Sequence, residues 1–488
     1  MSSATPVSSY PDPPLQYNVL MRIRNIALVL AVLLVVFAAV LVANYESAAR
    51  DLQSAQVSQT AGRYADSAKL YESAARQSFW QNDLWEKAGL AAYQSGDLKN
   101  ALRLLEIARQ KGSISAAGWD ALGSASWKLD LQPSAFAFWR SGMQAHPSFL
   151  PLLDHLALAE HEQGDYAAEQ GILINRLALA SDAASHYRLG LLLTDSDLPR
   201  AQTEFRAASG LNPEFSPAAQ TMQVTLNLAQ LESNPSRRLV VIGRGLGLVE
   251  EWGLAARAFR SAAALDPSNA EAWAWLGEVE GQLGQDGKAD LDRAAALAPI
   301  EPLIHEMLGL YWRRDGDLSQ ALKEYTQAAQ LEPANPAWQA ALGDLFTQSG
   351  DLVSALNAYV TAANLATNDP TYLRLLSTFC SDNNVHVLDI GLPSAQKAAA
   401  LAPDDPQVLD ALGWSYLESG FPKSAEQNLL KAIKASPGLV SAHLHLAETY
   451  LQEGNKASAL QELELARQLD PNGANGQVAA SLLKQYFP

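Results

Sequence analysis

The chain has 488 residues and a formal net charge of −17 at pH 7. This acidity argues against a general nucleic-acid-binding role, because such a role needs a basic face. A single cysteine, Cys380, excludes an intrachain disulfide framework. The length exceeds what one hydrophobic core ordinarily supports, which favours an architecture that does not depend on one core.

The N-terminal region predicts a short tail and one membrane helix. Residues 1–21 are rich in serine and proline and show no hydrophobic periodicity, so we expect a disordered tail. Residues 22–45 follow, and their central part, Ile26 to Ala43, contains no charged or strongly polar side chain. That apolar run is long enough to cross a bilayer as a helix. Because it is apolar on every face, it does not resemble a buried helix of a globular domain.

The alternative interpretation of this segment is a cleaved signal peptide. Signal peptides usually have a shorter apolar core and a small-residue cleavage site, and here only Ser47-Ala48-Ala49 offers a weak one. We therefore favour an uncleaved single-pass anchor. Arg22 and Arg24 precede the span and Glu46 follows it, so the positive-inside tendency places the short N-terminus in the cytoplasm and the rest outside.

An internal repeat occupies most of the remaining chain. It is clearest in two adjacent segments, 271–302 and 303–336. Each contains a Leu-Gly pair, a glycine seven residues later, two alanines and a closing proline. In the first segment these are Leu276-Gly277, Gly284, Ala289, Ala296 and Pro299. Repeats of this length are typical of stacked helix pairs, in which small residues let two helices approach closely and proline ends the second helix.

The same positions recur along the chain. Leu-Gly or its equivalent recurs as Ala88-Gly89, Leu122-Gly123, Leu189-Gly190, Ile242-Gly243, Leu276-Gly277, Leu308-Gly309, Leu342-Gly343, Leu412-Gly413 and Leu446-Ala447. The turn glycine recurs as Gly96, Gly164, Gly284, Gly316, Gly350, Gly420 and Gly454. The alanine of the second helix recurs as Ala101, Ala135, Ala201, Ala255, Ala289, Ala321, Ala355, Ala425 and Ala459.

This pattern resembles the tetratricopeptide repeat (TPR), and the resemblance extends over residues 48–472. It implies an all-α fold, a TPR α-solenoid built as a right-handed superhelix of about eleven or twelve helix pairs. We expect a first repeat block over residues 46–216, an unpaired helix at a junction over 217–236, a second block over 237–472 and a C-terminal capping helix over 473–488. The repeat between Pro370 and Pro403 departs most, because it inserts a segment between its helices.

No motif in the sequence predicts catalysis, a cofactor or a metal ion. His443, His445 and Glu448 share one predicted helix, but His443 occupies a packing position of the repeat, so we do not expect a metal site. The glycine-rich run from Gly243 to Gly247 follows no strand and therefore fails the context test of a dinucleotide-binding loop. Cys380 is expected to be an ordinary buried thiol.

The resemblance also implies where a partner would bind. In TPR proteins the first helix of each pair lines a concave groove, and the corresponding positions here include charged and aromatic side chains of the kinds that dominate protein interfaces. The predicted partner-binding residues are Trp127, Lys128, Arg237, Arg244, Arg313, Arg314, Asp410 and Trp414, with Asp120 and Glu418 at further groove positions. The alternative to partner binding, for each of these residues, is that it is only a solvated charge or a partly packed ring.

We therefore expect a membrane-anchored scaffold that is not an enzyme, binds a peptide or protein partner in its groove and supports a cell-envelope complex. The alternatives are a non-catalytic subunit of an envelope enzyme or export system (secretion, cytochrome maturation or polysaccharide export), or a glycan-binding module that uses Trp127 and Trp414.

Overall fold

The computed structural model describes residues 15–78, 80–112 and 114–487, and the side chains of these from residue 24 onward. Over these ranges the regular structure is helical throughout, with twenty-six α-helices, a 3₁₀ turn and a π-helical turn. The predicted all-α class and TPR solenoid are confirmed. Residues 1–14 of the predicted N-terminal tail lie outside the described ranges.

Most helices form consecutive pairs, and we call the first helix of a pair A and the second B. The pairs are α1 (Leu15–Thr60) with α2 (Tyr64–Gln77), α3 (Asp83–Gln94) with α4 (Leu98–Gln110), α5 (Ala116–Lys128) with α6 (Gln132–Ala145), α7 (Leu150–Glu162) with α8 (Tyr166–Leu179), α9 (Ala183–Leu192) with α10 (Leu198–Leu211), α12 (Pro235–Leu248) with α13 (Trp252–Leu265), α14 (Ala270–Gln282) with α15 (Lys288–Leu297), α16 (Pro302–Asp315) with α17 (Leu318–Leu331), α18 (Pro336–Ser349) with α19 (Leu352–Leu365), α20 (Pro370–Asp382) with α21 (Leu392–Leu401), α22 (Pro406–Glu418) with α23 (Pro422–Ala435) and α24 (Val440–Gln452) with α25 (Lys456–Leu469). The remaining helices are α11 (Ser216–Leu231) and α26 (Ala474–Tyr486).

The turn between the helices of a pair is specified by two adjacent residues. Gly316 ends α16 in the left-handed conformation, with φ of +84°, which glycine adopts without steric cost. Asp317 follows, and its side chain accepts a hydrogen bond from the backbone N–H of Gln320, which caps α17. All seven turn glycines predicted from the sequence have positive φ. Asp130 and Glu250 have positive φ at the equivalent turns of their repeats, where a non-glycine residue costs conformational energy.

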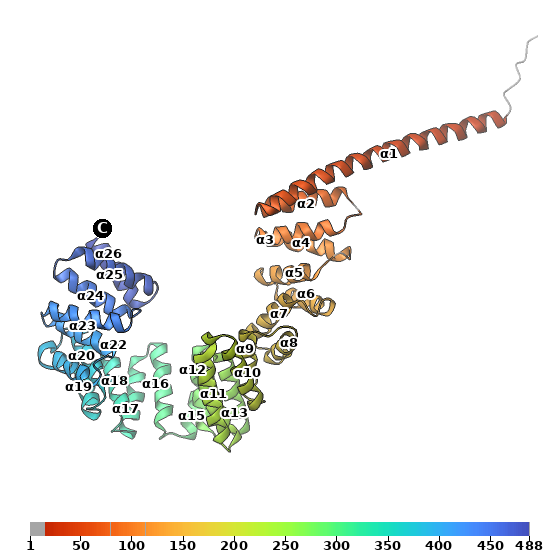
Figure 1. Cartoon of the computed structure of the whole chain (residues 1–488). Coiled ribbons are helices and arrows are strands. Elements are labelled where there is room, and N and C mark those ends of the chain that lie inside the picture. The colour runs from red at the N-terminus through yellow and green to blue at the C-terminus, as the bar shows by residue number, and fades with distance from the viewer. Residues whose placement is uncertain (1–14, 79, 113, 488) are drawn as a thin grey trace, which may run out of the picture. The chain divides into compact units, whose positions relative to one another are not determined.

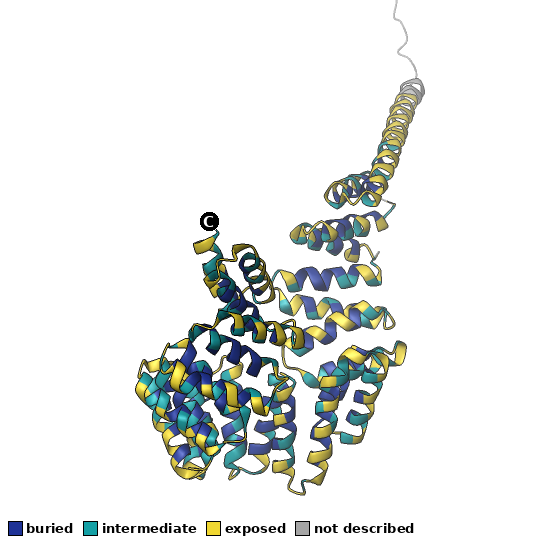
Figure 2. Ribbon diagram, turned by 60° about the vertical axis from the view of Figure 1, so that its left-hand side comes forward, coloured by how far each residue is buried: buried dark blue, intermediate teal, exposed yellow. Residues whose placement is uncertain are grey.

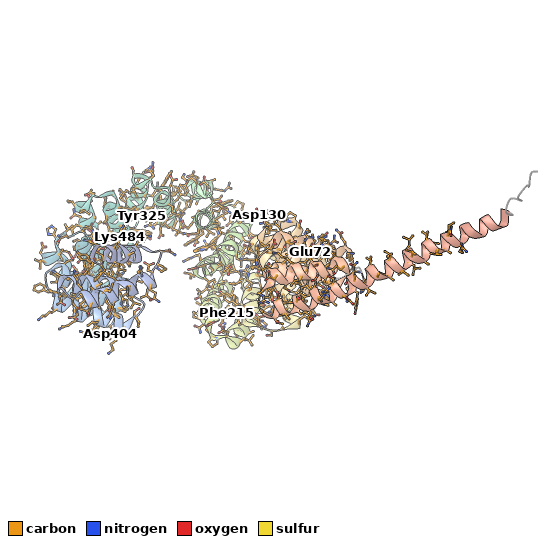
Figure 3. The ribbon with its side chains drawn as sticks, turned by 90° about the horizontal axis from the view of Figure 1, so that it is seen from above. Glu72, Asp130, Phe215, Tyr325, Asp404 and Lys484 are labelled. Carbon is orange, nitrogen blue, oxygen red and sulfur yellow. The ribbon has the colours of Figure 1, made fainter. Side chains whose placement is uncertain are left out.

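The core of most pairs is a close approach of the two helices at the Leu-Gly position. At Gly343 of α18 an added Cβ would collide with the ring of Tyr359 on α19, and at Gly309 of α16 it would collide with Tyr325 on α17 (Tyr325 is labelled in Figure 3). Glycine therefore makes room for a large side chain from the B helix. The same arrangement pairs Gly89 with Leu105, Gly123 with Trp139, Gly190 with Phe205, Gly243 with Phe259 and Gly413 with Leu429.

The alanine positions of the B helices are confirmed except in one repeat. Ala101, Ala321 and the equivalent alanines are fully buried, whereas Ala289 and Ala296 are exposed. In that repeat the small buried residues are Gly287, which packs against the backbone of Gly277, and Ala294. The prediction was wrong because it followed residue type, while the position 34 residues before Ala321 is Gly287.

α1 runs as one unbroken helix from the apolar segment into the first repeat (Figure 1). From Ile26 to Val40 its large side chains are exposed, Phe37 for example by 63 %, and Figure 3 shows the side chains of this part standing clear of other elements. Its last turns pack on α2, where Ser67 donates to the backbone carbonyl of Ala55 (3.0 Å). The helix begins at Leu15, so residues 15–21 are helical rather than part of a tail. No helix breaker follows Pro14 before the apolar segment.

The chain divides into two compact units, residues 1–220 and 221–488. In each, neighbouring helices pack in chain order and A helices of consecutive pairs also touch, as α5 and α7 do in the first unit and α22 and α24 in the second. Buried faces therefore line the interfaces between helices while the outward faces stay exposed (Figure 2). The division falls within the segment 217–236 that the sequence assigned to a junction.

Three other segments complete the units. The unpaired helix expected at the junction, α11, does have a neighbour, because a Cβ on Gly245 of α12 would meet Thr225. The insertion in the Pro370 repeat forms a π-helical turn, Val387–Gly391, before α21. At the C-terminus α26 buries Ala479 against apolar side chains of α24 and α25, as a capping helix requires.

We predict that Gly343→Ala destabilises the second unit by about 1–3 kcal/mol, because the new methyl group must displace the Tyr359 ring from a close-packed site. This loss outweighs the gain of up to about 1 kcal/mol that alanine brings to a helix interior. Gly171→Ala is the matched control: Gly171 lies in the middle of α8 with no atom within 4 Å of an added Cβ. Gly171→Ala should therefore raise the free energy of unfolding. Urea unfolding followed by far-UV circular dichroism measures the change in the free energy of unfolding for both variants. A change of the same sign in the two variants would contradict the packing argument.

Candidate functional site

The predicted partner-binding residues lie on four A helices, α5, α12, α16 and α22. The structure gathers most of them into three clusters, one in the first unit and two in the second. Each cluster borders a cavity, and we name the cavities after a tryptophan in each lining: the Trp127 pocket, the Trp275 pocket and the Trp414 pocket.

The Trp127 pocket, of about 210 Å³, lies in the first unit between α3, α5, α6 and α7. The rings of Trp127 and Trp139 form one wall, with centroids 5.9 Å apart. Lys128 lies over the ring of Tyr93 at 5.1 Å, and its ammonium donates to the Tyr93 hydroxyl (3.4 Å). His155 stacks on Trp139, with centroids 6.1 Å apart. The pocket is therefore an aromatic slot with a cation at its edge.

His155 is held by Asp120, another of the predicted groove residues. The distance from Nδ1 of the imidazole to Oδ1 of Asp120 is 2.6 Å. This hydrogen bond to Asp120 raises the pKa of His155 above its ordinary value, and burial opposes the shift only in part. The carboxylate therefore favours the charged imidazolium and leaves its Nε2–H directed away from Asp120.

The Trp275 pocket, of about 340 Å³, lies between α12, α13, α14 and α16. Arg244 lies over the Trp275 ring at 5.5 Å and pairs with Glu271 at 3.6 Å. Arg314 holds both carboxylate oxygens of Glu278, at 2.7 and 2.9 Å. Such bidentate pairs orient both groups strongly, so Arg314 braces two neighbouring repeats and its charge is already neutralised.

The two remaining predicted arginines lie outside these pockets. Arg313 is exposed on α16, and no ion pair reaches it from the described part of the chain. Arg237 is exposed in the first turn of α12 and borders a polar cavity with Asp266 and Glu271. The pair Arg313 and Arg314 thus does not form one cationic patch, because only Arg313 keeps its charge free.

The Trp414 pocket, of about 490 Å³, lies between α22, α24 and α26. The indole of Trp414 stacks on His445, with centroids 4.4 Å apart and planes within 8° of parallel. Its Nε1–H donates to Asp382 (2.8 Å). Asp410 is buried, accepts from Ser441 (2.6 Å) and bonds to Nδ1 of His445 (2.8 Å). Asp410, which we expected to face a partner, is therefore committed to internal hydrogen bonds.

Acidic groups crowd around this pocket. Burial raises the pKa of Glu448 and of Glu418, and nearby carboxylates, Asp382 among them, add to both shifts. Burial also raises the pKa of Asp382. Burial opposes the charge of His445, yet the surrounding carboxylates outweigh it and raise its pKa as well. One imidazole thus offsets several carboxylates, and the pocket keeps an excess of negative charge.

The other residues singled out in the sequence have structural roles. Nδ1 of His443 lies 2.6 Å from Glu462, and its Nε2 lies 3.0 Å from the backbone carbonyl of Pro437. Trp273 donates in the same way to Pro267 (3.1 Å), so this repeat position satisfies a carbonyl left free at the end of the preceding B helix. Burial raises the pKa of Cys380 to about 12, which keeps it a thiol.

Sequence reasoning missed Tyr93, Trp139, His155 and Glu448 as pocket residues. Two signals were present. Tyr93 lies one repeat, 34 residues, before Trp127, and each aspartate–histidine pair, Asp120 with His155 and Asp410 with His445, is separated by 35 residues. A spacing of one repeat plus one residue places two side chains on adjacent A helices, side by side.

Comparisons with known proteins place the helical pairs in a family. Two tetratricopeptide-repeat profiles match residues 313–378 and 411–474. Over 112 residues the chain is 33 % identical to the cellulose synthase operon protein C of Escherichia coli K12, and a putative protein of the same name from strain O157:H7 matches equally. The aligned part covers 23 % of this chain and 9 % of that relative's length.

Solved structures with a similar arrangement include yeast Tom70, at 14 % identity and a TM-score of 0.41 with 90 % of this chain and 95 % of that one covered. A tetratricopeptide repeat protein from Parabacteroides merdae is 16 % identical, with a TM-score of 0.40 over 51 % of this chain and 97 % of that one. The peptide-binding TPR protein YrrB is 18 % identical, with a TM-score of 0.29 over 39 % of this chain and 97 % of that one.

The crowding of acids predicts a pH-dependent stability. Because the folded-state pKa values of Glu448, Glu418, Asp382 and His445 are all raised, the native state binds protons more tightly than the unfolded chain. These four groups should therefore contribute more stability as pH falls from about 8 toward about 4.5, the ordinary carboxyl range, and the histidine part is lost as pH rises through its folded pKa.

Glu448→Gln should raise the free energy of unfolding at about pH 8 by roughly 0.5 kcal/mol and should flatten the pH response, since it removes a charge that burial and the neighbouring carboxylates disfavour. Glu464→Gln, at an exposed position of α25, is the control and should change neither. Thermal unfolding at the two pH values measures this. An unchanged pH response in the Glu448 variant would show that these acids do not interact.

Proposed function

Because this chain is a tetratricopeptide-repeat protein, we propose that it is a membrane-tethered scaffold that binds a protein or peptide partner along its A helices. The observation that carries the proposal is the contrast between the two kinds of helix. The large B-helix side chains Tyr325, Tyr359 and Phe205 are buried against glycines. On the A helices, Trp127 and Trp414 stay partly exposed and line open pockets.

Partly exposed aromatic rings beside charged groups are the usual anchors of protein interfaces. Packing within the repeats does not require these rings to face a cavity, so their placement favours recognition over stability. The architecture itself is non-catalytic in type, and we assign the chain no chemical step.

The membrane anchor is the second part of the proposal. α1 is the one helix of the described residues that is long and apolar enough to cross a bilayer, and none of its apolar window is buried. The same helix continues into the first repeat through Asp51, which accepts from Ser73 of α2 (2.7 Å). An anchor of this kind joins the repeats rigidly to the membrane surface. With Arg22 and Arg24 on its N-terminal side, the repeats lie outside the cytoplasm.

The partial similarity to a cellulose synthase operon protein supports an envelope setting. We therefore propose a polysaccharide-producing assembly as the first class of complex in which to search for the partner. A glycan as the ligand itself is the second candidate, supported by the aromatic walls of the Trp127 pocket.

The anchor is tested by fractionation and topology. The full chain should remain in the membrane pellet after alkaline carbonate, and a variant that lacks residues 1–43 should become soluble. Protease added to cells with a permeabilised outer barrier should digest the repeats while a cytoplasmic marker survives. Protection of the repeats would invert the orientation, and a soluble mature chain that begins near Ala49 would show a cleaved signal peptide instead.

The binding surface is tested with a photo-reactive amino acid. Placed at Glu418, beside the Trp414 pocket, or at Arg244, it should cross-link the partner in cells. Placed at Lys323 or Glu464, which are exposed on B helices, it should not. Cross-links confined to the B-helix positions would contradict binding along the A helices.

A further inference from the structure

The Trp127 pocket has an unusual inventory of hydrogen-bonding groups. Ser124 is 6 % exposed, and its Oγ has no partner in the described part of the chain. Nε1 of Trp139 also has no partner there, but it faces Gly123 of α5. Both residues belong to the lining of the cavity. Buried polar groups are seldom left without partners, because an unmade hydrogen bond costs free energy. The Ser124 hydroxyl is therefore one lining group of the pocket with which an occupant could form a hydrogen bond.

The groups at the edge of the pocket are donors too. Lys128 uses one of its three N–H donors on the Tyr93 hydroxyl, whose own proton then remains available. His155 uses Nδ1 on Asp120, and its protonated form has Nε2–H to spare. No carboxylate belongs to the lining of this cavity. The two acids that act on His155 are engaged, Asp120 by His155 itself and Asp154 by Arg176. The occupant must consequently bring acceptors.

The charge of the pocket further limits the chemical classes that could occupy it. The ammonium of Lys128 supplies a positive charge at the edge of the pocket. The imidazolium of His155, whose charge Asp120 balances, supplies a further charge-assisted donor. A neutral sugar would present hydroxyl donors as well as acceptors, and this lining offers few acceptors for them. A carboxylate is acceptor-only and matches donors on several sides.

The size and walls of the pocket indicate how the carboxylate is carried. A cavity of about 210 Å³ admits one side chain. The faces of Trp127 and Trp139 provide an apolar slot in which a short aliphatic stem can lie, with its charged end toward Lys128 and His155.

We propose that the Trp127 pocket receives the side-chain carboxylate of an aspartate or glutamate from an extended acidic segment of the protein partner. The inference rests on the proposed function, because it names the chemistry of the segment that this scaffold binds. It also assigns the two units different preferences: the Trp127 pocket of the first unit selects acids, and the acidic Trp414 pocket of the second unit does not.

The test uses the full chain in nanodiscs as bait for a phage-displayed library of random peptides. Clones are recovered on the wild type and then tested on Lys128→Met, His155→Gln, Glu418→Gln and Lys99→Met. Lys99 is the matched control, since it is an exposed lysine on α4 of the same unit. Circular dichroism confirms that each variant keeps the helical content of the wild type.

We expect a class of clones that binds the wild type and Lys99→Met but loses at least about ten-fold in affinity on Lys128→Met and on His155→Gln, with an aspartate or glutamate at a shared position. Synthetic peptides with this acid changed to asparagine or glutamine should bind the wild type at least about ten-fold more weakly, yet bind Lys128→Met equally.

Three outcomes would overturn the inference: no clone depends on Lys128, the dependent clones share no acid, or the acid-to-amide change has no effect. If clones are recovered whose binding depends on Glu418 but never on Lys128, the inference fails while the proposed function stands. If no clone binds the wild type above empty nanodiscs, and a glycan array shows binding that is lost in Trp127→Ala, both the inference and the protein-binding function fail in favour of a glycan ligand.

Discussion

The structure depends on one recurring contact, the insertion of a large B-helix side chain against a glycine of the A helix. Without a Cβ at Gly309 or Gly343, the helices approach closely enough for a tyrosine ring to fill the space between them. The position is occupied by tryptophan, phenylalanine, tyrosine or leucine in different repeats, so the requirement is bulk rather than one residue type. A pair that is closed in this way can stack on the next and bury a continuous core.

Because large side chains of the B helices fill the space within the pairs, the A helices can present side chains to the pockets. Their buried side supports the stack, while side chains on the other side meet the equivalent side chains of the next repeat. Neighbouring A helices thus combine residues one repeat apart, as with Tyr93 and Lys128 or Asp410 and His445. The clusters that result differ in chemistry, an aromatic slot with donors in the first unit and an acidic pocket in the second, although the same backbone arrangement builds both.

The candidate site was predicted in part. Trp127, Lys128, Arg244 and Trp414 do lie beside pockets, because their register in the repeat determines the helix face they occupy. Arg314 and Asp410 also lie at predicted groove positions of their repeats. However, Arg314 is paired with Glu278, and Asp410 is hydrogen-bonded to His445 and Ser441. The position of a residue in the repeat determines which way its side chain points. Whether a charged side chain remains unpaired depends on the residue that the next repeat places opposite it. That residue is known only when two repeats are aligned in space.

The sequence by itself determined the class of fold, the helix pairs, their turns and the apolar helix that precedes them, because glycine, proline and alanine at fixed spacing act locally through backbone sterics. It was misleading at Ala289 and Ala296, where residue type suggested a register that helix packing does not adopt. Only the tertiary structure decided that α1 passes without interruption into the first repeat, that α11 packs on α12, and that Tyr93, Trp139 and His155 share one pocket. These features arise from contacts between residues distant along the chain, and such contacts are determined by the way the helices stack.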